Sequence, residues 1–384
     1  MWGTKKLKVF MKNKILKTKN IYYFFYPFVV LYTIIIFFKG FSNFNLNLIW
    51  NSLYHSDYFI NYQSGFIRRG LDGEIIYHIA ELINFNPLII QKTINLISFT
   101  IFIFLIFRII IKNKVIPLFY YFSTGCLLLY LEYIQYGIRK DHLTIIYFLL
   151  ILKVYKSKKT ETFKHLFLNI ICIIATLTHE IFYIVFIIPI FFLFFIDSYR
   201  KIYILIPSFV IFSLTIIFKG NELNEQLIIE SWERLGVNNI KFNSGIFTNT
   251  IYIWKIGLTP KQYIGLFLML LGNFVFLIVS LSIKIIIDKK NILFIFSQYL
   301  ICFCLCMVAC DFSRWIFFTN ISIVLTLAAV QKIKYHSISN RISLKLLLSI
   351  FLYFIINTQH IGWSYNVYIK NIPLKLMYNF LTQL

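Results

Sequence analysis

Long apolar runs separated by short polar breaks dominate the pattern of this chain. Many of these runs approach the ~20 residues that an α-helix needs to cross a bilayer. A chain inside lipid must satisfy its own backbone hydrogen bonds, so such runs are expected to be helices. The pattern predicts eleven spans, near residues 21–39, 88–111, 115–135, 142–155, 165–178, 181–196, 202–218, 263–287, 291–309, 315–331 and 343–356. We therefore expect one all-α, polytopic membrane domain over residues 1–384.

Composition agrees with this pattern. Hydrophobic residues make up 59% of the chain, charged residues only 14%, and the mean hydropathy is +0.75. A soluble domain normally carries about 25% charged residues. The excess of apolar side chains therefore favours a membrane protein over a soluble one.

The distribution of basic residues predicts the orientation of the spans. Seven lysines between Lys5 and Lys19 precede the first run, and no small-residue cleavage site follows it. This indicates a retained first span with a cytoplasmic N-terminus. If the spans alternate, most other lysines and arginines fall in loops on the same side, and the C-terminus is extracytoplasmic. The net charge of +23 then reflects topology and attraction to anionic lipids, and it gives no support to nucleic-acid binding.

Two long loops are predicted on the outer face, at residues 40–86 and 219–262. The first contains Asp57 and the pair Arg68-Arg69, followed by a helical pattern over residues 71–84. Its apolar side carries Ile75, Ile76, Ile79 and Leu82. We expect this helix to lie along the membrane surface.

Three further polar clusters fall on the same predicted face. They contain Arg139, Asp141 and His142, then His179 and Glu180, then Asp311 and Arg314. Together with the first loop they indicate an extracytoplasmic site. With no motif for a nucleotide, a hydrolase nucleophile or a zinc protease, and no paired aspartates near Asp57, we expect neither a metal nor a cofactor.

Each candidate has two interpretations. Adjacent guanidiniums at Arg68 and Arg69 suit a diphosphate, or they contact lipid phosphates. Asp57 is a proton acceptor, or an ordinary solvated or capping carboxylate. His179 and Glu180 form an acid/base pair or a substrate-hydroxyl contact in a tight hairpin.

The same choice applies to the remaining clusters. Arg139, Asp141 and His142 bind substrate, or they pair among themselves because unpaired charge at membrane depth is costly. Asp311 and Arg314 also bind substrate, or they form a helical i,i+3 ion pair.

The layout resembles O-antigen and capsule repeat-unit polymerases (Wzy type) and the related GT-C glycosyltransferases that use polyprenyl-linked sugars. The shared features are the number of spans, the basic cytoplasmic N-terminus, an acid in a long early outer loop (Asp57), and a second large outer loop. GT-C enzymes usually carry an acidic pair where this chain has Asp57 alone. That departure, with the added sequence Gly65–Gly70, favours the polymerase group.

The resemblance implies transfer of a glycan from polyprenyl diphosphate to an acceptor sugar hydroxyl at the outer face of a bacterial cytoplasmic membrane. Arg68 and Arg69, with Arg139 or Arg314, would bind the departing diphosphate. Asp57, His179 or Glu180 would accept the hydroxyl proton. Expected partners are the polyprenyl-diphosphate oligosaccharide, membrane lipids, and a chain-length regulator or flippase. The alternatives are a single-sugar GT-C-type transferase and, from another class, a transporter of lipid-linked glycans.

Overall fold

The computed structural model describes residues 57–113, 140–195, 199–238, 289–308 and 312–330, together with residues 240, 242, 270, 271 and 274. Within these ranges every regular element is helical. The predicted spans at residues 21–39, 115–135 and 343–356, and most of 263–287, lie outside the described residues.

Helices occur where the other seven spans were predicted. They are α4 (Pro87–Asn113), α7 (Asp141–Tyr155), α8 (Glu161–Thr178), α9 (Ile181–Phe194), α10 (Ile206–Ile217), α15 (Lys289–Val308) and α16 (Phe312–Val330). A 3-10 helix, η3 (Tyr199–Leu205), leads into α10. We call these seven α-helices the bundle.

Local sequence explains several helix ends. Pro87 begins α4, where a missing backbone donor has no cost. The Thr160 hydroxyl accepts a hydrogen bond from the Phe163 amide and caps α8. Asn84 ends α3 (Gly70–Ile83) in the left-handed region, with φ of 49°.

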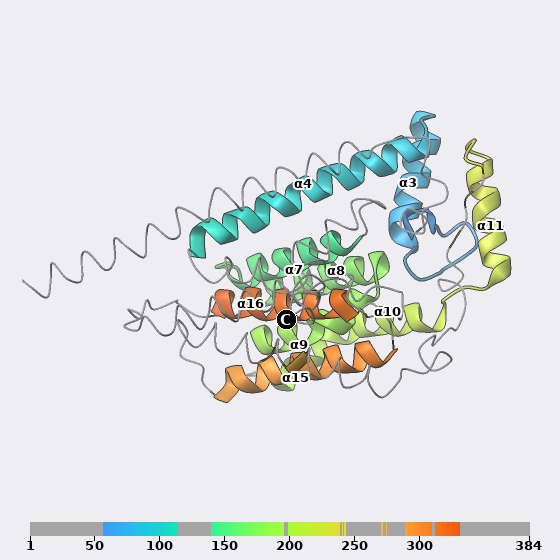
Figure 1. Cartoon of the computed structure of the whole chain (residues 1–384). Coiled ribbons are helices and arrows are strands. Elements are labelled where there is room, and N and C mark those ends of the chain that lie inside the picture. Colours follow the sequence, from blue (N-terminus) through green and yellow to red (C-terminus); the bar gives the residue numbers. More distant parts are fainter. Residues whose placement is uncertain are drawn as a thin grey trace, which may run out of the picture.

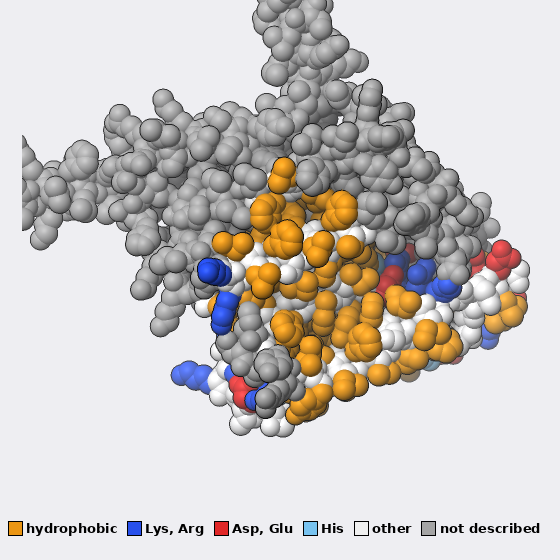
Figure 2. Space-filling view, turned by 90° about the horizontal axis from the view of Figure 1, so that it is seen from below, with side chains coloured by type: hydrophobic (Ala, Val, Ile, Leu, Met, Phe, Trp, Pro, Cys, Tyr) orange, Lys and Arg blue, Asp and Glu red, His pale blue; other side chains and the backbone are white. Residues whose placement is uncertain are grey.

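The bundle packs around α16. Every side chain from Phe318 to Leu327 whose burial the structure describes is buried, and α16 contacts α7, α9 and α15. Helix α8 in turn packs between α7 and α10. Exposed apolar side chains cover the outside of α4, α8, α10 and α15. Figure 2 shows such side chains over the middle of one face, with charged groups gathered toward its ends.

Two continuous helices in the described part are long and apolar enough to cross a membrane, Glu161–Thr178 and Lys289–Cys306. The segments Lys201–Ile217 and Glu222–Glu233 pass the same test as a pair bent by 98°. Shorter apolar helices occur at Pro87–Phe102, Ile181–Phe194 and Phe318–Leu327. The predicted number of eleven spans therefore stays a prediction.

A second unit, which we call the cap, is formed by residues 57–83 and the described part of 218–242. It contains η2 (Asp57–Phe59), α3 and α11 (Glu222–Glu233), and Figure 1 places α3 and α11 at one end of the bundle. Helix α11 was not predicted from the sequence. Asn221 caps the start of α11 through reciprocal hydrogen bonds with Asn224. The chain bends by 98° between α10 and α11.

The cap has a hydrophobic core that is separate from the bundle core and also takes in Leu88 and Ile90 of α4. Trp232 on α11 packs edge-on against Phe59 and Tyr77, and its indole N–H donates to the Phe59 carbonyl at 2.7 Å. The face of α3 toward this core carries Gly73, Ile76, Tyr77 and Ala80. Of the apolar side predicted for this helix, only Ile76 is fully buried, whereas Ile75 and Leu82 are exposed on the outside of the cap.

Candidate functional site

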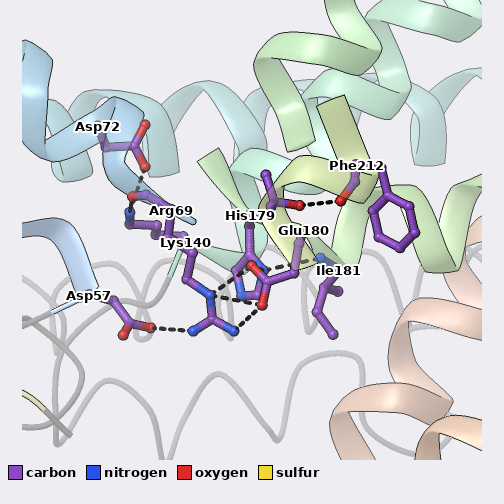
Figure 3. A network of polar contacts seen from close by, with 9 residues as sticks. Asp57, Arg69, Asp72, Lys140, His179, Glu180, Ile181 and Phe212 are labelled. Atoms are coloured by element: carbon purple, nitrogen blue, oxygen red, sulfur yellow. Dashed lines mark hydrogen bonds and ion pairs between the residues drawn. The ribbon is translucent and has the colours of Figure 1, made fainter. Parts of the chain in front are cut away.

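The cap meets the bundle through a cluster of charged side chains. Asp57, Arg69 and Asp72 come from the cap, Lys140 directly precedes α7, and His179 and Glu180 lie in the hairpin between α8 and α9. Figure 3 shows these side chains pointing toward one another. Segments more than 100 residues apart in the chain are thus brought to one place.

Arg69 and Glu180 form the tightest contact of the cluster. The Arg69 Nε donates to both carboxylate oxygens, at 3.0 and 2.8 Å, and Nη2 donates to Oε1. The side chains are only 17% and 7% exposed. Burial by itself raises the pKa of the Glu180 carboxyl, but the charges of Arg69 and His179 and their hydrogen bonds outweigh it. The pKa of Glu180 therefore lies well below its usual range.

Asp57 lies on the other edge of the same guanidinium. Its Oδ2 is 3.5 Å from Arg69 Nη1, and its side chain is 22% exposed, against 7% for Glu180. Asp57 begins the short helix η2, whose next two residues, Tyr58 and Phe59, are buried in the cap core. The buried neighbours fix the carboxylate in place while its side chain stays partly exposed.

Lys140 forms a second link between bundle and cap. Its Nζ is 3.0 Å from Asp72 Oδ2 and donates to the Arg69 carbonyl at 3.2 Å. The side chain is 1% exposed, and Nζ also lies 5.2 Å from the centre of the Tyr58 ring. The Thr178 hydroxyl, at the end of α8, donates to the other oxygen of Asp72 at 3.3 Å.

The backbone of Arg69 is itself unusual. Its φ of 64° places a long side chain in the left-handed region, which non-glycine residues seldom adopt. Such conformations persist where surrounding contacts enforce them, and they gather at functional sites. Here Lys140 holds the Arg69 carbonyl while Glu180 holds the side chain. The conformation directs the guanidinium from the cap into the bundle.

His179 is almost fully buried beside Glu180. Its Nδ1 accepts a hydrogen bond from the Ile181 amide at 3.3 Å and lies 3.5 Å from Glu180 Oε2. An amide can only donate, so the first contact belongs to the neutral ring with Nδ1 unprotonated. The second becomes an ion pair when the ring is protonated. His179 thus caps the start of α9 in one state and pairs with Glu180 in the other.

Arg68 also belongs to the cluster. Burial lowers the pKa of its guanidinium, Glu180 and Asp57 act in the opposite direction, and the adjacent charge of Arg69 lowers it further. These effects place Arg68 within electrostatic range of the same groups. Its backbone N–H donates to the Phe218 carbonyl at 3.0 Å, which ties the loop to the end of α10.

Two of the other predicted site residues make their described contacts within the bundle. His142 bonds Ser98 through Nε2 at 2.7 Å and packs edge-on against Phe99, so its ring faces α4. Asp141 is buried at the start of α7, where its carbonyl accepts from Thr144. Arg139 and Asp311 lie outside the described residues, as does the side chain of Arg314.

Lys140, Asp72 and Thr178 are site residues that sequence reasoning missed. Lys140 stands among four consecutive ionisable residues, and no pattern distinguished the one that faces the cap. Asp72 carried a clearer signal, because it lies in the first turn of a predicted helix two residues after the Arg68-Arg69-Gly70 turn. An acid there falls beside the arginines once the helix forms.

The cluster has the chemistry of an anion-binding or proton-transfer site. Three cations and three carboxylates lie at the junction of two structural units, and one carboxylate, Asp57, keeps appreciable exposure. Among the side chains that the structure describes, no group of three or more His, Cys, Asp and Glu could hold a metal ion.

Comparison with known proteins gives one match. Residues 26–190 match the model of a family described as "Uncharacterised membrane protein Rv1490". No curated protein and no solved structure matches the chain. The matched range contains every residue of the cluster, from Asp57 to Glu180. With its apolar helices, this similarity identifies the chain as a helical membrane protein.

Proposed function

We propose that this protein is a membrane glycosyltransferase that uses a polyprenyl-diphosphate sugar donor at the outer face of a bacterial cytoplasmic membrane. The observation that carries the proposal is the partly exposed Asp57 carboxylate, held beside buried cations at the junction of cap and bundle. Sugar transfer from a diphosphate needs both elements, a proton acceptor and positive charge for the leaving group.

Asp57 is the proton acceptor that the geometry favours. Glu180 is buried, chelated by Arg69 and shifted to a pKa well below its usual range, so it is a weak base with little access to a substrate. The side chain of His179 is 1% exposed, and its Nδ1 is occupied by the Ile181 amide. We therefore assign Glu180 the role of positioning Arg69.

The reaction follows from these roles. The acceptor hydroxyl oxygen attacks the anomeric carbon, and its proton passes to Asp57. The bond between that carbon and the diphosphate oxygen breaks, and the electron pair leaves with the diphosphate. Arg68 and Arg69 offset the charge that develops there. A single direct displacement inverts the anomeric centre.

Within this class we propose the repeat-unit polymerase. The support is the layout that the chain shares with such polymerases, which extends over the spans and both outer loops. A polymerase and a single-sugar transferase would share the same chemistry at Asp57. They differ in product, because a polymerase makes a ladder of chain lengths and a single-sugar transferase changes the mass of each repeat.

The test is Asp57→Asn in cells that make the polysaccharide. This change keeps the size of the side chain and removes the base, so we expect the ladder to collapse to a single repeat unit. General-base catalysis contributes about 10²–10⁴-fold to a rate, so a partial defect would argue against this role. Glu81→Gln is the matched control, because this substitution removes the same charge from the same cap at a side chain that is 58% exposed. A normal ladder from well-expressed Asp57→Asn would overturn the proposal.

A further inference from the structure

A row of aromatic side chains lies beside the charged cluster and has no part in it. Tyr62 and Phe66 stack with ring centres 5.7 Å apart and planes inclined by 15°. Phe66 meets Phe218, at the end of α10, edge-on at 5.9 Å. Phe66 and Phe218 are 40% and 48% exposed. We call these three residues the aromatic platform.

The loop that carries the platform is tightly held. The Tyr62 amide donates to the Glu74 carboxylate at 2.7 Å. The Gly65 amide donates to the Tyr62 carbonyl at 2.9 Å. The Ser64 carbonyl accepts from Asn224 of α11 at 3.1 Å. The Tyr62 ring lies directly over Gly70, where a Cβ would come within 2.2 Å of it. Exposed aromatic rings on a fixed loop are preorganised for a ligand.

Lipid acyl chains do not suit this place. Residues 60–69 form turns and irregular backbone, which does not occur against hydrocarbon because its polar groups would lack partners. Polar groups also border the rings, since the exposed Gln63 side chain donates to Glu74 at 3.0 Å. The ligand must therefore combine an apolar face with hydroxyl or amide groups.

We propose that the aromatic platform is a sugar-binding subsite. A pyranose ring presents C–H bonds on one face, which stack on the electron-rich face of an aromatic ring. Its hydroxyls lie around the rim, where Gln63 and Glu74 offer an amide and a carboxylate. The platform is continuous with the charged cluster, because Arg68 follows Phe66 by two residues and bonds the Phe218 carbonyl. This inference rests on the proposed function and extends it by placing a sugar beside the diphosphate.

The sugar belongs either to the donor or to the acceptor, and kinetics separates them. The probes are the lipid-linked saccharide extracted from cells that lack this protein and the same saccharide released by mild acid. With full-length protein in nanodiscs, we expect Phe66→Leu to raise KM for one of the two by about fivefold to tenfold, with kcat nearly unchanged. Phe66→Trp should retain a low KM because it keeps the aromatic face.

Phe85→Leu is the matched control. Phe85 is 49% exposed, follows α3 in the sequence and lies outside the platform, so we expect no change in KM. An equal rise in KM for Phe85→Leu, or no rise for Phe66→Leu with either probe, would overturn the inference.

Two further measurements separate this inference from the proposed function. Calorimetric titration of the released saccharide should show weaker binding to Phe66→Leu than to the unaltered protein, even if no transfer occurs. Transfer that is insensitive to Phe66 would refute the platform and leave the transferase standing. The Phe66→Trp variant adds a fluorescent indole to the platform. If brominated phosphatidylcholine in the nanodisc quenches this added fluorescence and saccharide does not change it, the platform binds lipid rather than sugar.

Discussion

The cap and the bundle are held together by different forces. The bundle core is built mainly from aliphatic and phenylalanine side chains of α4, α7, α8, α9, α15 and α16. The smaller cap core centres on one buried tryptophan, Trp232, which gathers the rings of Phe59 and Tyr77 from a distant part of the chain. The larger bundle core is spread over many helices, whereas the cap core gathers around one tryptophan.

The junction between them differs from both cores. Arg69 with Glu180, and Lys140 with Asp72 and the Arg69 carbonyl, cross from one unit to the other. Buried ion pairs depend strongly on having both partners present. The two units should therefore respond very differently to the loss of one charge, and the junction should be the most sensitive place in the described structure.

Glu180→Ala should have the largest effect. It removes the carboxylate that chelates the largely buried Arg69 guanidinium, and breaking a buried pair costs about 3–5 kcal/mol. We expect a large drop in the Tm of the detergent-solubilised protein and loss of activity. Thermal unfolding followed by size-exclusion chromatography measures the first effect.

The double change Arg69→Met with Glu180→Leu is the control. Replacing both charges by apolar side chains of similar size is often neutral for stability. We expect most of the Tm to return while activity stays lost. If the double variant were as unstable as Glu180→Ala, the cost would come from packing rather than from the unpaired charge.

Gly73→Ala tests how closely the cap is packed. Alanine normally stabilises a helix interior relative to glycine by roughly 0.5–1 kcal/mol. Here a Cβ would lie 1.9 Å from the Ile60 carbonyl oxygen, so backbone must move, and overpacking costs about 1–3 kcal/mol. We expect a lower Tm. Gly70→Ala should cost less, because its obstacle is the side chain of Tyr62; the reverse order would contradict this packing.

The difference between the units also explains what the sequence could predict. Apolar run length located the bundle helices, because it is a local property of the sequence. The cap depended on contacts that no local pattern shows. Glu222–Glu233 carries several acids and was expected to be loop, yet it forms a helix because Asn221 caps it and Trp232 is buried against Phe59.

The residues of the candidate site were likewise predictable only in part. Asp57, Arg68, Arg69, His179 and Glu180 were selected because charge is rare in this chain, and the structure brings them together. Among the residues at the start of α7, the side chain that joins the cap is Lys140, whereas His142 turns toward α4. Successive helical residues point in different directions, so only the packing of α7 decides between them.

Loss of a single hydrogen bond should cost more in the cap than in the bundle. Trp232→Phe removes the indole donor and leaves the buried Phe59 carbonyl without this partner, at about 1–3 kcal/mol. Ser322→Ala removes the bond from α16 to Gln298 of α15, and such bonds between membrane helices average about 0.6 kcal/mol. Equal changes in Tm for the two variants would show that the cap tolerates the loss of one hydrogen bond as well as the bundle does.

The smallest expected effect is the response of the junction to mild acid. The pKa of Glu180 is lower in the folded protein than its ordinary value of 4.5, because Arg69 and His179 stabilise the charged form against the effect of burial. A carboxyl shifted in this direction contributes stability that is fully present above pH 4.5 and is lost as the pH falls through the lower folded pKa. The contribution of the pair between Glu180 and Arg69 should therefore stay constant from pH 7 to 5 and decline only in stronger acid. The difference in Tm between the unaltered protein and Glu180→Gln, measured across this range, isolates that contribution from other titrating groups. A difference that disappears by pH 5 would mean that the charges of Arg69 and His179 do not hold Glu180 ionised, and the ionic link between cap and bundle would then rest on Lys140 and Asp72.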